Sequence, residues 1–327
     1  MKKMHFATFG IVLLFLGIFF NFFSIVINIP RRLFFDTSYT YNLNVAFLWY
    51  SGIPIVIGIL FIFIDFILNI GRIRKNKIIM DKPLENKLIT VVLTAYNDYK
   101  SIGLSVEDFL SHNLVKRVIV ISNNSNDKTI DIAKQAGAIV FNEEKQGYGR
   151  CVYRAFQEGI KFNDTSLIAL CEGDMTFRAN DIDKFLSYIS HADIVVGSRI
   201  VEQLQGNNTQ ISTFIHYGNL FVGKLLESKH LGLISLTDVG TTYKLCRNEV
   251  LEELLPKLDP SVNLEFNPYF LDKALDLGKK IVECPITFHK RIGESKGGNV
   301  NNIIAFKLGL KMIYGILFDW YGLEKKL

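Results

Sequence analysis

The sequence predicts an α/β protein with a doubly wound, mostly parallel sheet, preceded by two transmembrane helices. Apolar runs of strand length alternate with helical segments between residues 88 and 198, and this order is typical of parallel sheets. The run Leu167–Cys171 is apolar at every position, as expected for a strand buried on both faces. Two long stretches without charge precede these elements.

Two N-terminal segments are long and apolar enough to span a bilayer. Phe6–Ile29 has no charged residue, and a helix of this length, rising about 1.5 Å per residue, covers the ~30 Å hydrocarbon core. Pro30 and the arginines after it are expected to end this helix. Thr37–Ile64 is also free of charge, so we expect helices over about 6–29 and 43–70 within residues 1–77. A cleaved signal peptide is the alternative for the first segment, but the run is too long and lacks a small-residue cleavage site.

The distribution of basic residues predicts the orientation of these helices. Lys2 and Lys3 precede the first helix, four basic residues lie between positions 72 and 77, and only two lie between the helices. By the positive-inside rule, both chain ends and the main domain are cytoplasmic, in a multi-pass protein of the cell membrane. The cluster at 72–77 is expected to contact anionic headgroups of the lipid bilayer. Asp65 is expected at the membrane interface and not as a functional acid within the membrane.

Charge and cysteine content argue against other classes of protein. The net charge is only +5, so no nucleic-acid partner is expected. The four cysteines are far apart and show no C-x-x-C spacing, which indicates reduced thiols and not zinc ligands or disulfides.

An α/β domain is expected over residues 88–300, after a polar linker at 78–87. The expected strands are Leu88–Tyr96, Arg117–Ser122, Ala138–Phe141, Leu167–Cys171 and Asp193–Ser198. The expected helices are Ile102–His112, Thr129–Ala136, Tyr148–Lys161, Asp181–His191, Ser212–Ser228, Asn248–Leu255 and Asn263–Leu277.

The C-terminal segment 301–327 has an amphipathic pattern. Lys307, Lys311 and Asp319 interrupt its apolar residues and argue against a third membrane span. A helix lying in the membrane interface fits this pattern, and a helix packed on the domain's own core fits it as well.

Two carboxylates, Glu172 and Asp174, follow the buried strand directly. Ligands of parallel sheets bind beyond the carboxyl ends of the strands, and two acids at one edge repel each other unless a cation or a proton separates them. Mg²⁺ or Mn²⁺ prefers oxygen ligands and takes the others from phosphates and water, so the pair predicts a metal site for a diphosphate-bearing substrate. A solvated turn is the alternative for the triplet alone.

Seven segments occur in order between Leu88 and Lys296. They are VVLTAYND (91–98), VIVISNNSNDKT (118–129), QGYGRCVYRAF (146–156), CEGDMTFRANDI (171–182), VVGSR (195–199), TDVGTTYKLCRNEVL (237–251) and ECPITFHKRIGESK (283–296). Each is weak evidence alone, but in this order they resemble family 2 glycosyltransferases with the GT-A fold. They are similar to polyprenyl-phosphate sugar transferases in particular, such as dolichyl-phosphate mannose or glucose synthases.

This resemblance implies an inverting glycosyltransferase that uses Mg²⁺ or Mn²⁺. It would move one sugar from a nucleotide diphosphate sugar to a polyprenyl phosphate, dolichyl or undecaprenyl, on the cytoplasmic face. A processive polysaccharide synthase of the same fold is an alternative, although its Q-x-x-R-W segment is absent. A non-catalytic membrane scaffold that kept the fold is another, because Ser122 and Glu172 replace commoner family residues.

The resemblance also implies which residues bind the nucleotide. Ala95, Tyr96 and Asp98 correspond to the loop that holds base and ribose, where the family usually has Pro at Thr94 and Glu at Asp98. Asn123 adjoins the position of an acid that reads the base, and an amide can still hydrogen-bond a base edge. A polar turn that caps the next helix is the alternative, and both can hold at once.

Two further segments are expected near the diphosphate. Gly147 and Gly149 would let the backbone approach the donor at a helix start, although this is also a common way for a helix to begin. Arg291, Ser295 and Lys296 lie in a loop that folds over the diphosphate in the family, and a basic solvated loop is the alternative.

Catalytic roles are implied for Asp174, Arg199 and Asp238. Glu172 and Asp174 occupy the family's Asp-x-Asp metal position, with Asp174 the safer ligand. Arg199 matches an arginine that binds the acceptor phosphate, or it forms an ordinary strand-end ion pair. Asp238 matches an acid near the acceptor that acts as a base or orients groups around the sugar. A phosphate with a second pKa of about 6 is already largely dianionic at neutral pH, so strong base catalysis is unnecessary.

Overall fold

The computed structural model describes residues 5–34, 37–75, 81–206, 209, 211–293 and 302–323. The chain divides into two compact units. The first unit comprises residues 1–78 with 227–233, and the second comprises residues 79–226 with 234–327.

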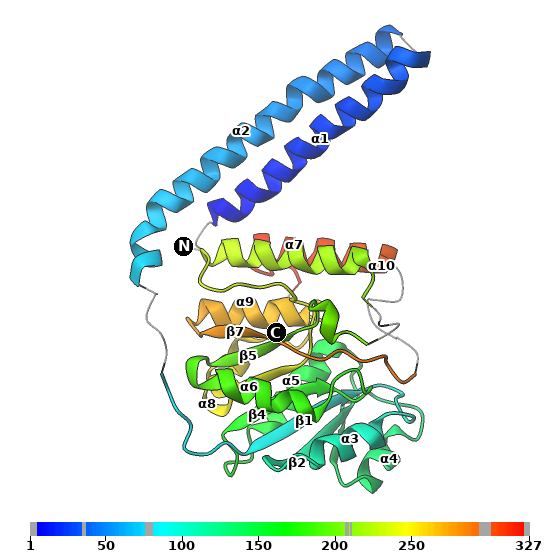
Figure 1. Ribbon diagram of the computed structural model, residues 1–327, viewed down its shortest axis with the longest axis vertical. Helices are drawn as coiled ribbons and strands as arrows, with labels where there is room; N and C mark the ends of the chain where they lie inside the picture. The colour runs from blue at the N-terminus through cyan, green and yellow to red at the C-terminus, as the bar shows by residue number, and fades with distance from the viewer. Residues whose placement is uncertain are drawn as a thin grey trace. The chain divides into compact units, whose positions relative to one another are not determined.

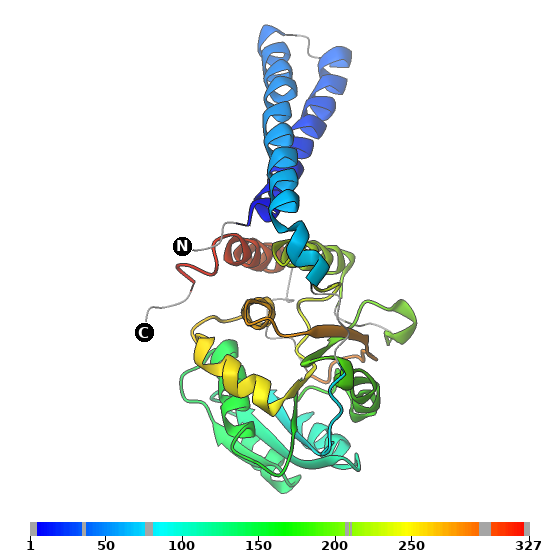
Figure 2. The ribbon, with the colours of Figure 1, turned by 90° about the vertical axis from the view of Figure 1, so that its left-hand side faces the viewer.

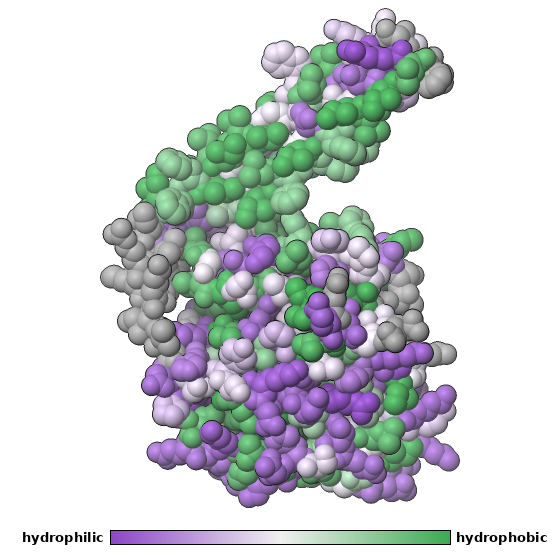
Figure 3. Space-filling view, viewed as in Figure 1, coloured by the Kyte–Doolittle hydropathy of each residue, from purple (hydrophilic) through white to green (hydrophobic). Residues whose placement is uncertain are grey.

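The first unit is a helical hairpin of α1 (Phe6–Phe34) and α2 (Ser38–Lys75) (Figure 1). Both helices are long and apolar enough to cross a membrane, as the sequence predicts. Hydrophobic side chains cover most of the length of both helices (Figure 3). The helix α1 continues past Pro30 by one turn, and α2 passes through Pro54, so neither proline ends its helix.

Small and polar residues hold the two helices close together. A Cβ atom at Gly10 would lie 2.6 Å from the carbonyl oxygen of Gly58, and the reverse distance is also 2.6 Å. Asn44 donates through Nδ2 to the carbonyl oxygen of Ser24, and Ser24 donates through Oγ to that of Asn44. Small residues that allow backbones to approach and polar contacts between helices are the usual means of association in membranes.

The side chain of Asp65 accepts two hydrogen bonds within this hairpin. Its Oδ2 accepts a hydrogen bond from the backbone nitrogen of Ala7 at 2.8 Å, and its Oδ1 accepts one from Asn69 Nδ2 at 2.7 Å. The first turn of a helix has unpaired N–H groups and favours a negative charge. Asp65 therefore caps the start of α1.

The second unit is built on a seven-stranded sheet in the order β3-β2-β1-β4-β6-β5-β7. Its strands are β1 (Ile89–Ala95), β2 (Val115–Ser122), β3 (Ile139–Asn142), β4 (Leu167–Glu172), β5 (Ile194–Ser198), β6 (Lys244–Arg247) and β7 (Ile281–Pro285). All neighbouring pairs are parallel except the two that include β6. The predicted mostly parallel sheet is confirmed, while β6 and β7 are strands that the sequence did not predict.

Helices cover this sheet and extend beyond it (Figures 1 and 2). They are α3 (Ile102–Leu110), α4 (Thr129–Gln135), α5 (Tyr148–Gly159), α6 (Ile182–Tyr188), α7 (Thr213–Lys229), α8 (Asn248–Leu254), α9 (Phe266–Asp276) and α10 (Asn302–Leu317). In both views α7 and α10 run side by side, and the rings of Phe214 and Phe306 lie 6.5 Å apart between centroids.

The helix α10 is packed on its own unit at one end and has exposed apolar side chains at the other. Ile316 and the following Trp320 are fully buried, and Trp320 donates through Nε1 to Asp272 Oδ2 of α9 at 2.7 Å. Ile303 and Phe306 at the other end of the helix are 69% and 54% exposed. The C-terminal end of α10 is thus buried against its own unit, while apolar side chains at its N-terminal end are exposed on the surface.

The start of α5 is packed tightly against the loop before α9. A Cβ atom at Gly149 would lie 1.7 Å from the carbonyl oxygen of Val262 and 2.8 Å from the ring of Phe266. No side chain fits at Gly149 unless one of these two segments moves.

We expect Gly149→Ala to lower the melting temperature, because overpacking of this kind costs about 1–3 kcal/mol. The control is Gly218→Ala in α7, where a Cβ would meet nothing within 4 Å. Alanine is favoured over glycine in a helix by about 1 kcal/mol, so the control should be unchanged or slightly more stable. Thermal unfolding of both purified variants in detergent makes the comparison, and equal melting temperatures would contradict the packing argument.

Candidate active site

Four charged side chains from distant parts of the chain line one cavity of about 620 Å³. Glu172 ends β4, Asp174 lies two residues later, Arg199 follows β5 directly, and Arg291 lies in the loop after β7. Because β4 pairs with β1 in parallel, with Glu172 opposite Thr94, the carboxyl ends of these strands lie at the same edge of the sheet. The sheet therefore assembles the predicted site residues at the edge where α/β proteins bind their ligands.

Asp174, which is buried, and Glu172, which is half-buried, form a carboxylate pair. Asp174 Oδ1 accepts hydrogen bonds from the backbone nitrogen and Oγ1 of Thr176, at 3.0 and 2.5 Å. Glu172 Oε1 accepts one from Thr242 Oγ1 at 2.7 Å. Burial, together with the Asp174 charge, raises the pKa of Glu172 to about 7. The pair thus carries more negative charge than a buried site holds easily without a cation.

These carboxylates are suited to a divalent cation. Asp174 is 1% exposed, and its buried Oδ2 receives no hydrogen bond, although Arg291 Nη1 lies 2.8 Å away as an ion-pair partner. An oxygen of this kind keeps a lone pair for a further ligand. Two carboxylates with such an oxygen form the partial ligand set that Mg²⁺ and Mn²⁺ use when phosphates and water supply the rest.

Arg291 connects the carboxylate pair to the nucleotide loop predicted after β1. Its Nη1 pairs with Asp174, and its Nη2 donates to Asp98 Oδ1 at 3.1 Å. Asp98 Oδ2 in turn accepts from the backbone nitrogen of Tyr96 at 2.9 Å. Of the three loop residues expected near the diphosphate, Arg291 is thus placed beside the acids, while Ser295 and Lys296 lie outside the described residues.

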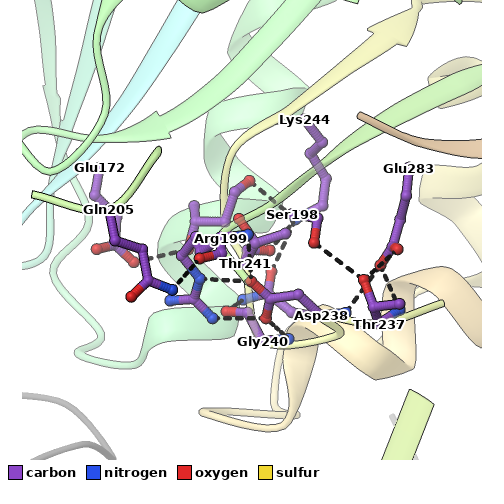
Figure 4. Close-up of polar contacts among 12 residues, drawn as sticks. Glu172, Ser198, Arg199, Gln205, Thr237, Asp238, Gly240, Thr241, Lys244 and Glu283 are labelled. Atoms are coloured by element: carbon purple, nitrogen blue, oxygen red, sulfur yellow. Dashed lines mark hydrogen bonds and ion pairs between the residues drawn. The ribbon is translucent and has the colours of Figure 1, made fainter. Parts of the chain in front are cut away.

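Asp238 is paired with Arg199 (Figure 4). It is not among the residues that line the cavity. Arg199 donates through Nε to Asp238 Oδ2 and through Nη2 to Oδ1, both at 2.7 Å. Glu283 fixes this loop by accepting from the backbone nitrogen of Asp238 at 2.9 Å, and from Thr237 through its backbone nitrogen and Oγ1. Burial acts to raise the pKa of Asp238, but the Arg199 guanidinium outweighs it and holds that pKa below its ordinary value.

This pairing bears on the two roles that the sequence left open for Asp238, as a base or as a residue that orients groups around the sugar. Its side chain is completely buried, and both oxygens accept hydrogen bonds from the Arg199 side chain. A carboxylate with a lowered pKa and occupied oxygens is poorly placed to take a proton from a substrate. Asp238 instead fixes the orientation of Arg199, whose Nη1 has no protein partner among the described residues.

The predicted nucleotide residues lie together at the ends of β1 and β2. The backbone nitrogen of Asn123 donates to the carbonyl oxygen of Ala95 at 2.8 Å. Asn123 Oδ1 accepts from the backbone nitrogen of Gly147 at 2.9 Å, which holds the start of α5 against this loop. Gly149 faces the carbonyl oxygen of Val262, so packing within the protein also accounts for a glycine at this position.

The opposite end of the cavity is apolar. It is lined by side chains of α7 and α10, including Phe214, Tyr217, Phe221, Phe306, Leu310 and Ile313. The exposed fractions of Phe214 and Phe306 are 43% and 54%, so this end reaches the surface of the unit. The cavity thus joins charged groups at the sheet edge to an apolar outlet.

Sequence reasoning missed several polar residues of the cavity. Tyr148, Thr242 and Asn267 line it, and the buried Lys244 lies behind them. Tyr148, Thr242 and Lys244 fall within the segments QGYGR and TTYK, whose polar residues were a usable signal. Asn267 lies near the start of the mostly buried helix α9, where nothing in the sequence marks it.

Comparison with known proteins agrees with this geometry. The chain is 27% identical over 209 residues to a dolichyl-phosphate hexose transferase of Haloferax volcanii, covering 64% of this chain and 86% of that protein. It is 27% identical over 250 residues to an undecaprenyl-phosphate mannosyltransferase of Micrococcus luteus, covering 74% and 99%.

A solved structure shows the same fold. Glucosyl-3-phosphoglycerate synthase of Mycobacterium tuberculosis, in complex with Mn²⁺ and UDP-glucose, superposes with a TM-score of 0.53 at 16% identity. The match covers 76% of this chain and 82% of that one. Residues 90–255 of the chain match the sequence profile of glycosyl transferase family 2. The protein has the GT-A fold and is a glycosyltransferase that belongs to glycosyl transferase family 2.

Proposed function

We propose that this protein transfers a single sugar from a nucleotide diphosphate sugar to a polyprenyl phosphate, with inversion at the sugar carbon. The observation that carries the proposal is the form of the cavity, which has carboxylates and guanidinium groups at one end and apolar side chains of α7 and α10 at the other. A polyprenyl phosphate has the matching chemistry, with one charged head and a long hydrocarbon chain. The names of the two relatives, which refer to dolichyl and undecaprenyl phosphate, support this acceptor class.

Arg199 is the proposed partner of the acceptor phosphate. Two of its nitrogens are held by Asp238, which leaves Nη1 for a substrate oxygen on the cavity side. A guanidinium held in this way loses little further freedom when it binds an oxyanion. Because the phosphate is already largely dianionic near neutral pH, the attacking oxygen needs no strong base, and Asp238 acts through Arg199.

Asp174 and Glu172 are the proposed ligands of Mg²⁺ or Mn²⁺ at the donor diphosphate. A bound cation supplies charge neutralisation for the departing nucleoside diphosphate. The solved structures of the mycobacterial synthase with Mn²⁺ or Mg²⁺ and UDP support a divalent metal in this fold. Arg291, which contacts both Asp174 and Asp98, would bind the diphosphate from the other side, while Ala95, Tyr96, Asp98 and Asn123 form the proposed base and ribose site.

The two apolar helices are the proposed membrane anchor. Residues 1–77 would hold the glycosyltransferase domain of residues 88–300 at the cytoplasmic face, and segment 301–327 would lie along the interface. Exposed apolar side chains of α10, such as Ile303 and Phe306, support contact with lipid.

Asp174→Asn should abolish transfer, because an amide cannot replace a carboxylate as ligand of a divalent cation. The matched control is Asp183→Asn, which removes a carboxylate that is 76% exposed on α6. Transfer of labelled sugar to polyprenyl phosphate is measured over a range of Mn²⁺ concentrations. Full activity of Asp174→Asn at saturating Mn²⁺ would rule out the metal assignment.

Arg199→Lys should raise the KM for polyprenyl phosphate and leave the KM for the donor nearly unchanged. A charge-assisted contact contributes about 1.5–3 kcal/mol, so the increase should be on the order of tenfold to a hundredfold if lysine recovers little of it. The control is Arg117→Lys. Arg117 lies near the start of β2 and forms another bidentate pair with an aspartate, Asp164. An effect confined to the donor KM would move Arg199 to the nucleotide side, and efficient elongation of a glycan chain would favour the polysaccharide synthase.

Cysteine labelling in intact cells tests the proposed orientation. All four native cysteines are buried, so background labelling should be low. Ser38→Cys, at the start of α2, should react with a membrane-impermeant maleimide in intact cells, whereas Lys145→Cys, an exposed site in the catalytic unit, should react only after permeabilisation. The reverse pattern would place the catalytic domain outside the cell.

A further inference from the structure

A chain of hydrogen bonds connects a buried lysine to one of the two acids. Lys244 Nζ donates to Asn267 Oδ1 at 2.9 Å, and Asn267 Nδ2 lies 3.1 Å from Tyr148 Oη. Tyr148 Oη lies 2.7 Å from Thr242 Oγ1, which in turn lies 2.7 Å from Glu172 Oε1. Four side chains, from β6, α9, α5 and the loop before β6, thus form a continuous series of hydrogen bonds that ends at Glu172, the last residue of β4.

The two ends of this chain fix its direction. The ammonium of Lys244 can only donate, which requires that Asn267 present its oxygen to it and its NH₂ group to Tyr148. Thr242 Oγ1 donates its single hydroxyl hydrogen to Glu172 Oε1. Thr242 must then accept from Tyr148, and Tyr148 must accept from Asn267. Every donor along the chain points toward Glu172.

Three of the four side chains in this network are almost completely buried, and Asn267 Nδ2 also lies 3.2 Å from the carbonyl oxygen of Gly240. Lys244, Thr242 and Asn267 are 1%, 2% and 6% exposed. The other two N–H groups of Lys244 are taken by the carbonyl oxygens of Thr241 and Thr242, at 3.0 and 2.9 Å. Burial lowers the pKa of Lys244 to about 8, and the charges of Glu172 and Asp238 act against this decrease. A buried polar network with every member satisfied holds one arrangement firmly.

We propose that Lys244 is a positioning residue for the donor site, acting on Glu172 through Asn267, Tyr148 and Thr242. This proposal rests on the proposed function, since it takes Glu172 to be a ligand of the cation. In this chain of hydrogen bonds Glu172 Oε1 accepts from Thr242, which leaves Oε2 for the cation. It also explains why glutamate stands at this position, because the shorter side chain of aspartate would not extend as far toward Thr242.

Binding of Mn²⁺ to the purified full-length protein, measured by electron paramagnetic resonance without substrates, tests the proposal. Lys244→Met, Tyr148→Phe and Thr242→Val should each raise the Kd for Mn²⁺ by roughly tenfold to a hundredfold, the range typical when the hydrogen-bond partner of a metal ligand is removed. The control is Tyr153→Phe, which removes a hydroxyl from the same helix that has no hydrogen-bond partner among the described residues. Its Kd should equal that of the wild type.

A double variant separates a connected chain from independent effects. Because Tyr148 acts only through Thr242, combining Tyr148→Phe with Thr242→Val should weaken Mn²⁺ binding no more than the stronger single change. If the two changes instead weaken Mn²⁺ binding additively, the two residues act independently and the proposed chain of hydrogen bonds is refuted. Thermal unfolding of each variant is recorded as well, and Tyr148→Phe, which keeps the ring, decides the question if Lys244→Met does not fold.

Two outcomes distinguish this proposal from the proposed metal site. If Tyr148→Phe binds Mn²⁺ as tightly as the wild type while Asp174→Asn does not bind it, the positioning role is refuted and the metal site stands. If Asp174→Asn also binds Mn²⁺ with wild-type affinity, the metal assignment fails, and the positioning role fails with it.

Discussion

The mutual repulsion of two carboxylates at the end of β4 is the constraint on which the site depends. Asp174 is buried and Glu172 is half-buried beside it, so nearby positive groups must compensate their charge. Arg291 pairs directly with Asp174, and the Lys244 ammonium reaches Glu172 through neutral side chains. Each compensating group comes from a different part of the chain. The charges at this edge therefore help to hold the loops of the sheet together, and a bound cation would complete the compensation.

The second ion pair of the site follows the same physical rule. Arg199 and Asp238 are both buried, and a buried charge without its partner is strongly destabilising. Their fork-to-fork geometry, with Glu283 holding the loop from behind, gives the guanidinium one orientation. A rigid cation next to an apolar outlet is suited to a phosphate that carries a hydrocarbon chain. The charged and the apolar residues of the cavity are thus both consistent with the proposed acceptor.

The sequence predicted most of the sheet but missed the strand that makes it mixed. Five strands are apolar runs bounded by polar residues, and such runs are recognisable without knowledge of their neighbours. The strand β6 has only four residues and begins and ends with charged residues, Lys244 and Arg247, which are 1% and 2% exposed. Such residues can be buried because their partners come from elsewhere, as with the carbonyl oxygens of Ile189 and Ala192 that accept from Arg247. Those partners are separated from Arg247 by more than 50 residues.

The sequence by itself determined the fold class, the two apolar helices and the acids that follow β4, because periodicity, length and local chemistry are properties of short segments. Only the tertiary structure decided which charges pair. Arg199 and Asp238 lie 39 positions apart, and nothing in the intervening sequence shows that the two side chains meet or that both oxygens of Asp238 are occupied by Arg199. The close approach of the Val262 backbone to Gly149 was likewise not predictable from the sequence. These contacts depend on the order of strands in the sheet, and that order is set by the packing of the whole unit.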